Sequence, residues 1–70
     1  MLAPDELKTR FTYHAPKADQ PAKYEKLRAL ALGMAEVIEQ ECPESRELAL
    51  ALTNLEQAVF WANAAIARRG

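Results

Sequence analysis

The sequence predicts a single all-α domain over residues 1–70, consisting of a short N-terminal helix followed by a long antiparallel helical hairpin, assembled into a homo-oligomer. Two stretches, 21–42 and 43–69, carry apolar residues at alternating spacings of three and four, the repeat of a helix with one buried face. Only a few residues separate them, so the two helices must fold back on each other. The second stretch is also apolar on two faces, and a short chain can cover only one of them.

The size and composition of the chain favour self-association. A chain of 70 residues buries roughly 60% of its unfolded surface and is marginal as a monomer. Small domains usually gain stability from disulfides, a metal or oligomerisation. Cys42 is the single cysteine and His14 the single histidine, so neither an intrachain disulfide nor a Cys/His zinc site is expected. Oligomerisation is the remaining source of stability on this list.

Charge and hydropathy argue against several classes of partner. The net charge is −1, without the basic field that binds long nucleic acid. No apolar run approaches the ~20 residues that span a membrane. Met1 to Arg10 carries acidic residues and does not resemble a signal peptide. Together with the lone cysteine, this favours a reducing cytoplasm.

The first 20 residues are expected to form a short helix and an irregular arm. Leu2 to Thr9 is the predicted helix, with Pro4 in its first turn, where a missing N–H does no harm. The arm, Phe11 to Gln20, is interrupted by Pro16, which disfavours helical geometry in the residue before it. Asp19 is then a plausible N-cap for the next helix.

The second helix, predicted over 21–42, has a regular apolar row and one glycine. Gly33 lies mid-helix and indicates either a close crossing with another helix or a tolerated cost of about 1 kcal/mol. The predicted inner row is Tyr24, Leu27, Ala31, Met34 and Ile38, widened by Leu30 and Val37.

The third helix, predicted over 43–69 with Pro43 at its first position, has two apolar faces. One row should pack against the second helix: Leu48, Leu52, Leu55, Val59, Ala62 and Ile66. The other is the expected oligomer interface: Leu50, Phe60, Trp61 and Ala64. Asn63, among alanines, could fix the register of an oligomer, as a lone polar residue in a seam can.

The sequence offers no readable catalytic constellation, and we do not expect an enzyme. There is no glycine-rich phosphate loop and no Ser–His–Asp or Cys–His arrangement. Carboxylates such as Glu36, Glu39 and Glu47 are typical of a solvated helix face. No cofactor or metal ion is expected.

Two aromatic side chains and a histidine crowd the arm. Phe11 and Tyr13 could fix the arm to the hairpin, or they could form a stacking surface for a planar ligand, which contributes about 1–3 kcal/mol per base. The residues alone favour the first role. His14 is expected to be a hydrogen-bonding tether rather than a catalyst.

Cations flank this arm. Lys26 and Arg28 lie early in the second helix, and Arg68 and Arg69 close the third. An antiparallel hairpin brings these two regions to one end of the molecule, near Tyr13. Aromatic rings beside cations suit a small anionic ligand with flat rings, such as a nucleotide. The alternative is that the cations only keep this end of the hairpin soluble.

Several segments resemble the helical hairpin domain of phage anti-CBASS sponge proteins, which also occurs in a Thoeris anti-defence protein. The resemblance is carried by Phe-Thr-Tyr-His-Ala-Pro at 11–16, by 24–28, by Cys-Pro-Glu-Ser-Arg-Glu at 42–47, by 50–56 and by Trp-Ala-Asn-Ala-Ala-Ile-Ala-Arg at 61–68. It implies a homohexamer that binds cyclic dinucleotides such as 3′,3′-cGAMP, and in some members cyclic trinucleotides. It also implies sequestration without cleavage, in the bacterial cytoplasm.

The resemblance also implies roles for individual residues. Tyr13 would stack on a base of a dinucleotide, and Arg28, or its neighbour Lys26, would bind the phosphates. Arg69 or Arg68 would match a terminal arginine linked to trinucleotide binding. Phe11 and His14 are candidates by proximity to Tyr13. The alternative function is a small helical structural or adaptor module with no nucleotide ligand.

Overall fold

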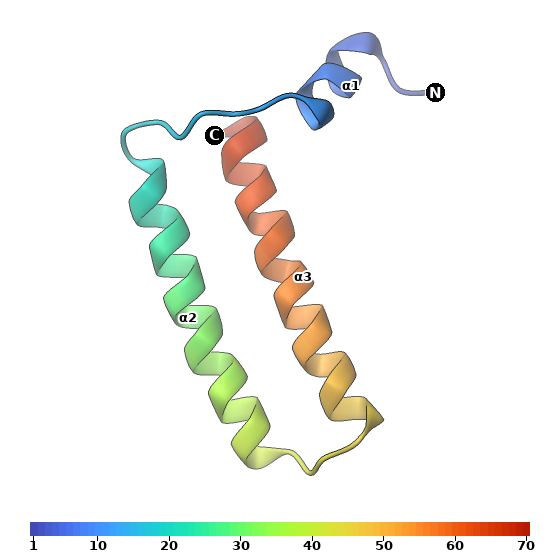
Figure 1. Cartoon of the computed structure of the whole chain (residues 1–70), viewed down its shortest axis with the longest axis vertical. Helices are drawn as coiled ribbons and strands as arrows, with labels where there is room; N and C mark the ends of the chain where they lie inside the picture. The colour runs from blue at the N-terminus through green and yellow to red at the C-terminus, as the bar shows by residue number, and fades with distance from the viewer.

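Three helices and no strand make up the structure, a computed structural model that describes all 70 residues. The helices are α1 (Pro4–Phe11), α2 (Gln20–Glu41) and α3 (Arg46–Arg69). The long helices α2 and α3 run antiparallel, and the arm between α1 and α2 passes the C-terminal end of α3 (Figure 1). The predicted all-α hairpin is confirmed. None of the helices is long and apolar enough to cross a bilayer.

The first two helices begin close to where the sequence places them. Pro4 opens α1, while Asp19 is the N-cap residue of α2 and Pro21 lies in its first turn. The Asp19 side chain does not cap the helix; it pairs with Lys23 one turn later, at 3.2 Å. The first helix ends at Phe11 instead of Thr9. Basic side chains in its last turn favour this extension, because they oppose the negative end of the helix dipole.

The start of the third helix was predicted wrongly. Pro43 lies in the loop, and the N-cap is Ser45, whose hydroxyl accepts a hydrogen bond from the Leu48 backbone N–H at 3.1 Å. A serine oxygen satisfies one of the N–H groups left free at a helix start, which a proline at the first position cannot do. The turn between α2 and α3 therefore covers residues 42–45.

The inner row of α2 also differs from the prediction. All six residues of the predicted α3 row are half-buried, but on α2 Met34 is 58% exposed, and Leu30 and Val37 are exposed as well. Ala35 is half-buried in place of Met34. The reason is the 3.6-residue repeat, which turns position 34 toward the edge of a straight helix and position 35 toward its neighbour.

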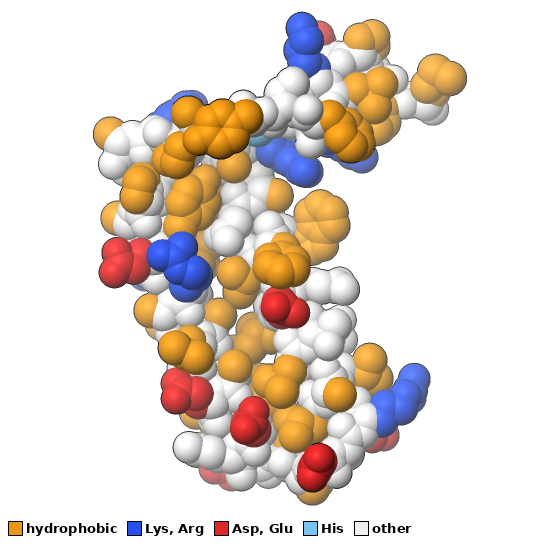
Figure 2. Space-filling view, viewed as in Figure 1, with side chains coloured by type: hydrophobic (Ala, Val, Ile, Leu, Met, Phe, Trp, Pro, Cys, Tyr) orange, Lys and Arg blue, Asp and Glu red, His pale blue; other side chains and the backbone are white.

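A single layer of helices leaves this chain without a hydrophobic core. The molecule measures 45 × 33 × 13 Å, so its thickness is about that of one helix with side chains, 10–12 Å. Gln20 is the sole buried residue, and no hydrophobic side chain is buried. The accessible surface is 5800 Å², against about 4,400 Å² for a compact monomer of this mass. Figure 2 shows hydrophobic side chains exposed on one broad face of the hairpin and on the arm.

Candidate functional site

The arm turns back on α1 through its histidine. His14 Nε2 lies 2.7 Å from the backbone carbonyl of Thr9, and the Thr12 hydroxyl donates to the carbonyl of Lys8 at 2.6 Å. Both carbonyls are among the last four of α1, which have no partner within the helix. His14 is therefore a tether that closes the end of α1, and its half-buried ring is already engaged there.

The two aromatic side chains of this region are open to solvent. Phe11 is 79% exposed and Tyr13 is 84% exposed. The favoured expectation, that they fix the arm to the hairpin, is wrong within one chain. Each ring presents apolar flat surface instead, which an aromatic base or a neighbouring protein surface could cover.

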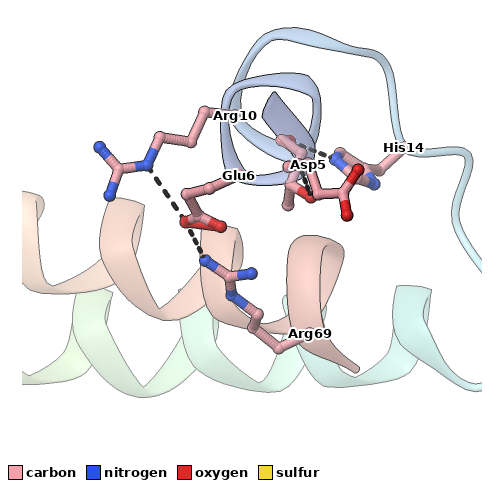
Figure 3. A network of polar contacts seen from close by, with 6 residues as sticks. Asp5, Glu6, Arg10, His14 and Arg69 are labelled. Atoms are coloured by element: carbon pink, nitrogen blue, oxygen red, sulfur yellow. Dashed lines mark hydrogen bonds and ion pairs between the residues drawn. The ribbon is translucent and has the colours of Figure 1, made fainter. Parts of the chain in front are cut away.

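The C-terminal end of α3 is bound to the N-terminal region by polar contacts. Arg69 Nη2 lies 2.5 Å from Glu6 Oε1, and the same oxygen accepts from Arg10 Nε at 3.3 Å (Figure 3). Lys17 Nζ donates to the Gly70 carbonyl at 2.8 Å. Arg68 is half-buried and makes no ion pair. The two terminal arginines therefore differ: Arg69 is engaged and Arg68 is not.

The ion pair shifts the pKa values of both Glu6 and Arg69. The hydrogen bond from Arg69 is the main cause that holds the pKa of the Glu6 carboxyl below its ordinary value. Desolvation opposes it, and the hydrogen bond from Arg10 lowers the pKa further. The same pair raises the pKa of Arg69. At neutral pH, Glu6 is thus ionised and Arg69 carries its full charge.

A second place of interest is the groove between α2 and α3. Its volume is about 830 Å³, within the range of ligand pockets. Arg28 and the opposing Phe60 and Asn63 belong to its walls, and Lys26 does not. The full lining is Glu25, Arg28, Ala29, Ala31, Leu32, Ala35, Leu52, Thr53, Leu55, Glu56, Val59, Phe60 and Asn63. The groove thus combines an apolar floor with one cation, two carboxylates and an amide.

Asn63 is a half-buried polar residue in the lining of this groove. Its Oδ1 atom is buried and has no hydrogen-bond donor. A buried acceptor without a donor costs about 1–3 kcal/mol, so an occupant that supplies an N–H or O–H group would relieve this cost. The sequence suggested a register role for Asn63 but gave no indication that its oxygen lacks a donor.

The predicted cations lie in two places and not in one cluster. Arg69 reaches α1 at the end of the hairpin, whereas Arg28 lies eight residues beyond the start of α2, about 12 Å along the helix axis. Lys26 is exposed outside the groove. Helix periodicity explains why Arg28 lines the groove and Lys26 does not, because residues two apart in a helix point about 200° away from each other.

The rest of the chain does not cover the expected oligomer interface. Trp61 is 66% exposed, Leu50 and Phe60 are exposed, and Ala64 is half-buried. Sequence reasoning missed two residues that make polar contacts with the C-terminal end of α3, Glu6 and Gln20. Both looked like ordinary first-turn residues, and no pattern in a single sequence identifies their distant partners.

Comparison with known proteins identifies the family. No curated protein and no solved structure matches the chain. A family model described as Acb2/Tad1, hairpin domain, matches residues 3–67, which confirms the resemblance inferred from the residue pattern. The chain therefore belongs to the Acb2/Tad1 hairpin family, the anti-CBASS and anti-Thoeris sponge family.

Proposed function

We propose that this protein binds cyclic di- and trinucleotide second messengers and sequesters them without cleaving them, which blocks CBASS antiviral signalling. Membership of the sponge family over residues 3–67 is the observation that carries the proposal. We further propose that it is a phage-type immune-evasion protein that acts in the host bacterial cytoplasm.

The proposed dinucleotide site uses the exposed aromatic ring and the groove cation. Tyr13 would stack on a base. This role is supported by its exposure of 84%, which leaves the ring free to contact a ligand. Arg28 would bind the phosphates, because it lines an open groove and a guanidinium can pair bidentately with a phosphate. Lys26 lies outside the groove and is the weaker candidate. Phe11 could add a second flat surface, whereas the engagement of His14 with Thr9 supports a structural role for it.

We also propose a homo-oligomer, a hexamer by family resemblance. The excess of accessible surface over a compact monomer is roughly 1,400 Å², while a standard protein interface buries about 800 Å² per partner. The exposed row of Leu50, Phe60 and Trp61 provides apolar area for it. Tyr13 and the groove need not meet within one chain, because neighbouring copies could bring them together.

The direct test is calorimetry with 3′,3′-cGAMP and a panel of cyclic di- and trinucleotides. We expect saturable binding to the wild type, and loss of dinucleotide binding in Tyr13→Ala and Arg28→Ala with unchanged oligomer mass. Tyr13→Phe, which keeps the ring, and Arg46→Ala, at the far end of α3, should bind as the wild type does. Ligand recovered intact after heat release would support sequestration without cleavage.

Two outcomes would contradict the proposal in different ways. If no cyclic nucleotide binds to the wild type, the alternative function, a helical structural or adaptor module, is favoured. If the wild type binds and both alanine variants bind equally well, the function stands but the site assignment is wrong. Retained binding in Arg28→Ala with loss in Lys26→Ala would move the phosphate site to Lys26.

A further inference from the structure

Glu6 occupies the guanidinium of Arg69 at the C-terminal end of α3. Its Oε1 atom lies 2.5 Å from Arg69 Nη2 and 3.3 Å from Arg10 Nε. Figure 3 shows the carboxylate between the two arginines, with Arg69 rising from the end of α3. The Glu6 side chain is only 25% exposed. The resting chain thus already supplies an anion to Arg69.

The helix that carries Glu6 is otherwise weakly held. No residue of α1 is buried, and Leu7 and Phe11 are exposed. An eight-residue helix is not stable in isolation, so its position depends on contacts at its ends. The Glu6–Arg69 pair joins α1 directly to α3, while the His14–Thr9 hydrogen bond and the Arg10–Glu6 pair are local to α1 and the arm.

We propose that Glu6 is an internal competitor for Arg69: an anionic ligand binds at the end of α3 by displacing the Glu6 carboxylate, and this displacement releases α1. The proposal rests on the proposed function for its biological ligand. Carboxylate and phosphate use the same fork of a guanidinium, and two anions at one arginine repel each other. Binding therefore exchanges one ion pair for another.

This exchange makes Glu6 a residue that determines which anions bind. A singly charged anion replaces the intramolecular pair with one of similar strength and gains little. A ligand with several phosphates adds further contacts, and their free energy offsets the cost of displacing the Glu6 carboxylate. Arg69 should consequently discriminate in favour of polyanions such as a cyclic trinucleotide over inorganic phosphate.

The test compares Glu6→Gln with Asp5→Asn as the matched control. The two variants lose the same charge at adjacent positions of α1, but Asp5 makes no ion pair. With 3′,3′,3′-cyclic tri-AMP as the probe, we expect the Kd of Glu6→Gln to fall by about two- to fivefold, the range of an exposed ion pair. Asp5→Asn should bind as the wild type does. A Kd for Glu6→Gln that is unchanged or higher would overturn the proposal and indicate that Glu6 positions Arg69.

Hydrogen exchange of the α1 backbone amides provides a readout that does not require a cyclic nucleotide. These amides should exchange faster in ligand-free Glu6→Gln than in Asp5→Asn, and faster in the wild type when tripolyphosphate is added. Equal exchange in both variants would overturn the proposal. If tripolyphosphate accelerates exchange but no cyclic nucleotide binds, the competition at Arg69 stands and the proposed function fails.

Discussion

The Gln20 side chain donates from Nε2 to the backbone carbonyl of Ile66 at 3.0 Å, which joins the first turn of α2 to the last turn of α3. Its Oε1 accepts from the Lys17 backbone N–H at 2.9 Å. Gln20 is 3% exposed and is the sole buried residue of the chain. The open end of the hairpin is therefore closed by a polar side chain that also orders the arm.

We expect Gln20→Ala to destabilise the fold by about 1–3 kcal/mol, because it removes two hydrogen bonds in a buried position and leaves the Lys17 N–H without its partner. Urea denaturation measures this change as a lower midpoint. Gln40→Ala, at an exposed position of the same helix, should change the free energy of unfolding by less than about 0.5 kcal/mol. Equal effects in the two variants would contradict the role assigned to Gln20.

The two glycines should respond oppositely to alanine. A Cβ at Gly33 would meet nothing within 4 Å, so the close helix crossing suggested by the sequence is absent within the chain. Gly33→Ala should stabilise α2 by about 0.5–1 kcal/mol. A Cβ at Gly70 would lie 2.5 Å from the Ile66 carbonyl oxygen, so Gly70→Ala should disturb the C-terminal cap. Thermal unfolding measures both, and a lower Tm for Gly33→Ala would show that another copy packs at that glycine.

Stability should fall in acid because two carboxyl groups have lowered pKa values in the folded chain. Glu6 is held by the hydrogen bond from Arg69 and Asp19 by that from Lys23. A lowered folded-state pKa contributes stability that is complete above the unfolded-state values, about 4.3 for glutamate and 3.9 for aspartate. That contribution is lost as pH falls through the lower folded-state values.

We therefore expect the urea midpoint to decrease from pH 6 to pH 3. The decrease should be smaller in Glu6→Gln and in Asp19→Asn, since each variant removes one of the two groups. Asp5→Asn is the matched control, as Asp5 makes no ion pair. A pH dependence that is identical in all three variants would contradict this assignment.

Self-association can be tested on the exposed face of α3. Light scattering should give a mass that is a multiple of the 7.8 kDa chain. Trp61→Glu places a charge where 66% of an indole is exposed in one chain, and it should reduce the mass if that face is the interface. Gln40→Glu, on α2, is the control. A wild type of 7.8 kDa would contradict the oligomer, whereas an unchanged mass in Trp61→Glu would place the interface elsewhere.

The hairpin was predictable because its signals are local. The spacing of Leu48, Leu52 and Leu55 identifies the inner row of α3, and Asp19 with Pro21 identifies the start of α2. The errors were also local in origin. Pro43 and Ser45 compete as start signals for one helix, and only the backbone geometry shows that the serine hydroxyl is used. Met34 and Ala35 are adjacent, and the packing of α2 on α3 selects the second.

The candidate site was less predictable, because its contacts join residues far apart in the chain. The sequence by itself determined the helical class, the hairpin and the family, since these depend on apolar periodicity and on segments read in order. Only the tertiary structure decided that Arg69 pairs with Glu6, that Arg28 lies in a groove apart from it, and that Gln20 closes the hairpin. The physical reason is that a hydrogen bond or ion pair depends on distances of about 3 Å, which residue types and spacings do not specify.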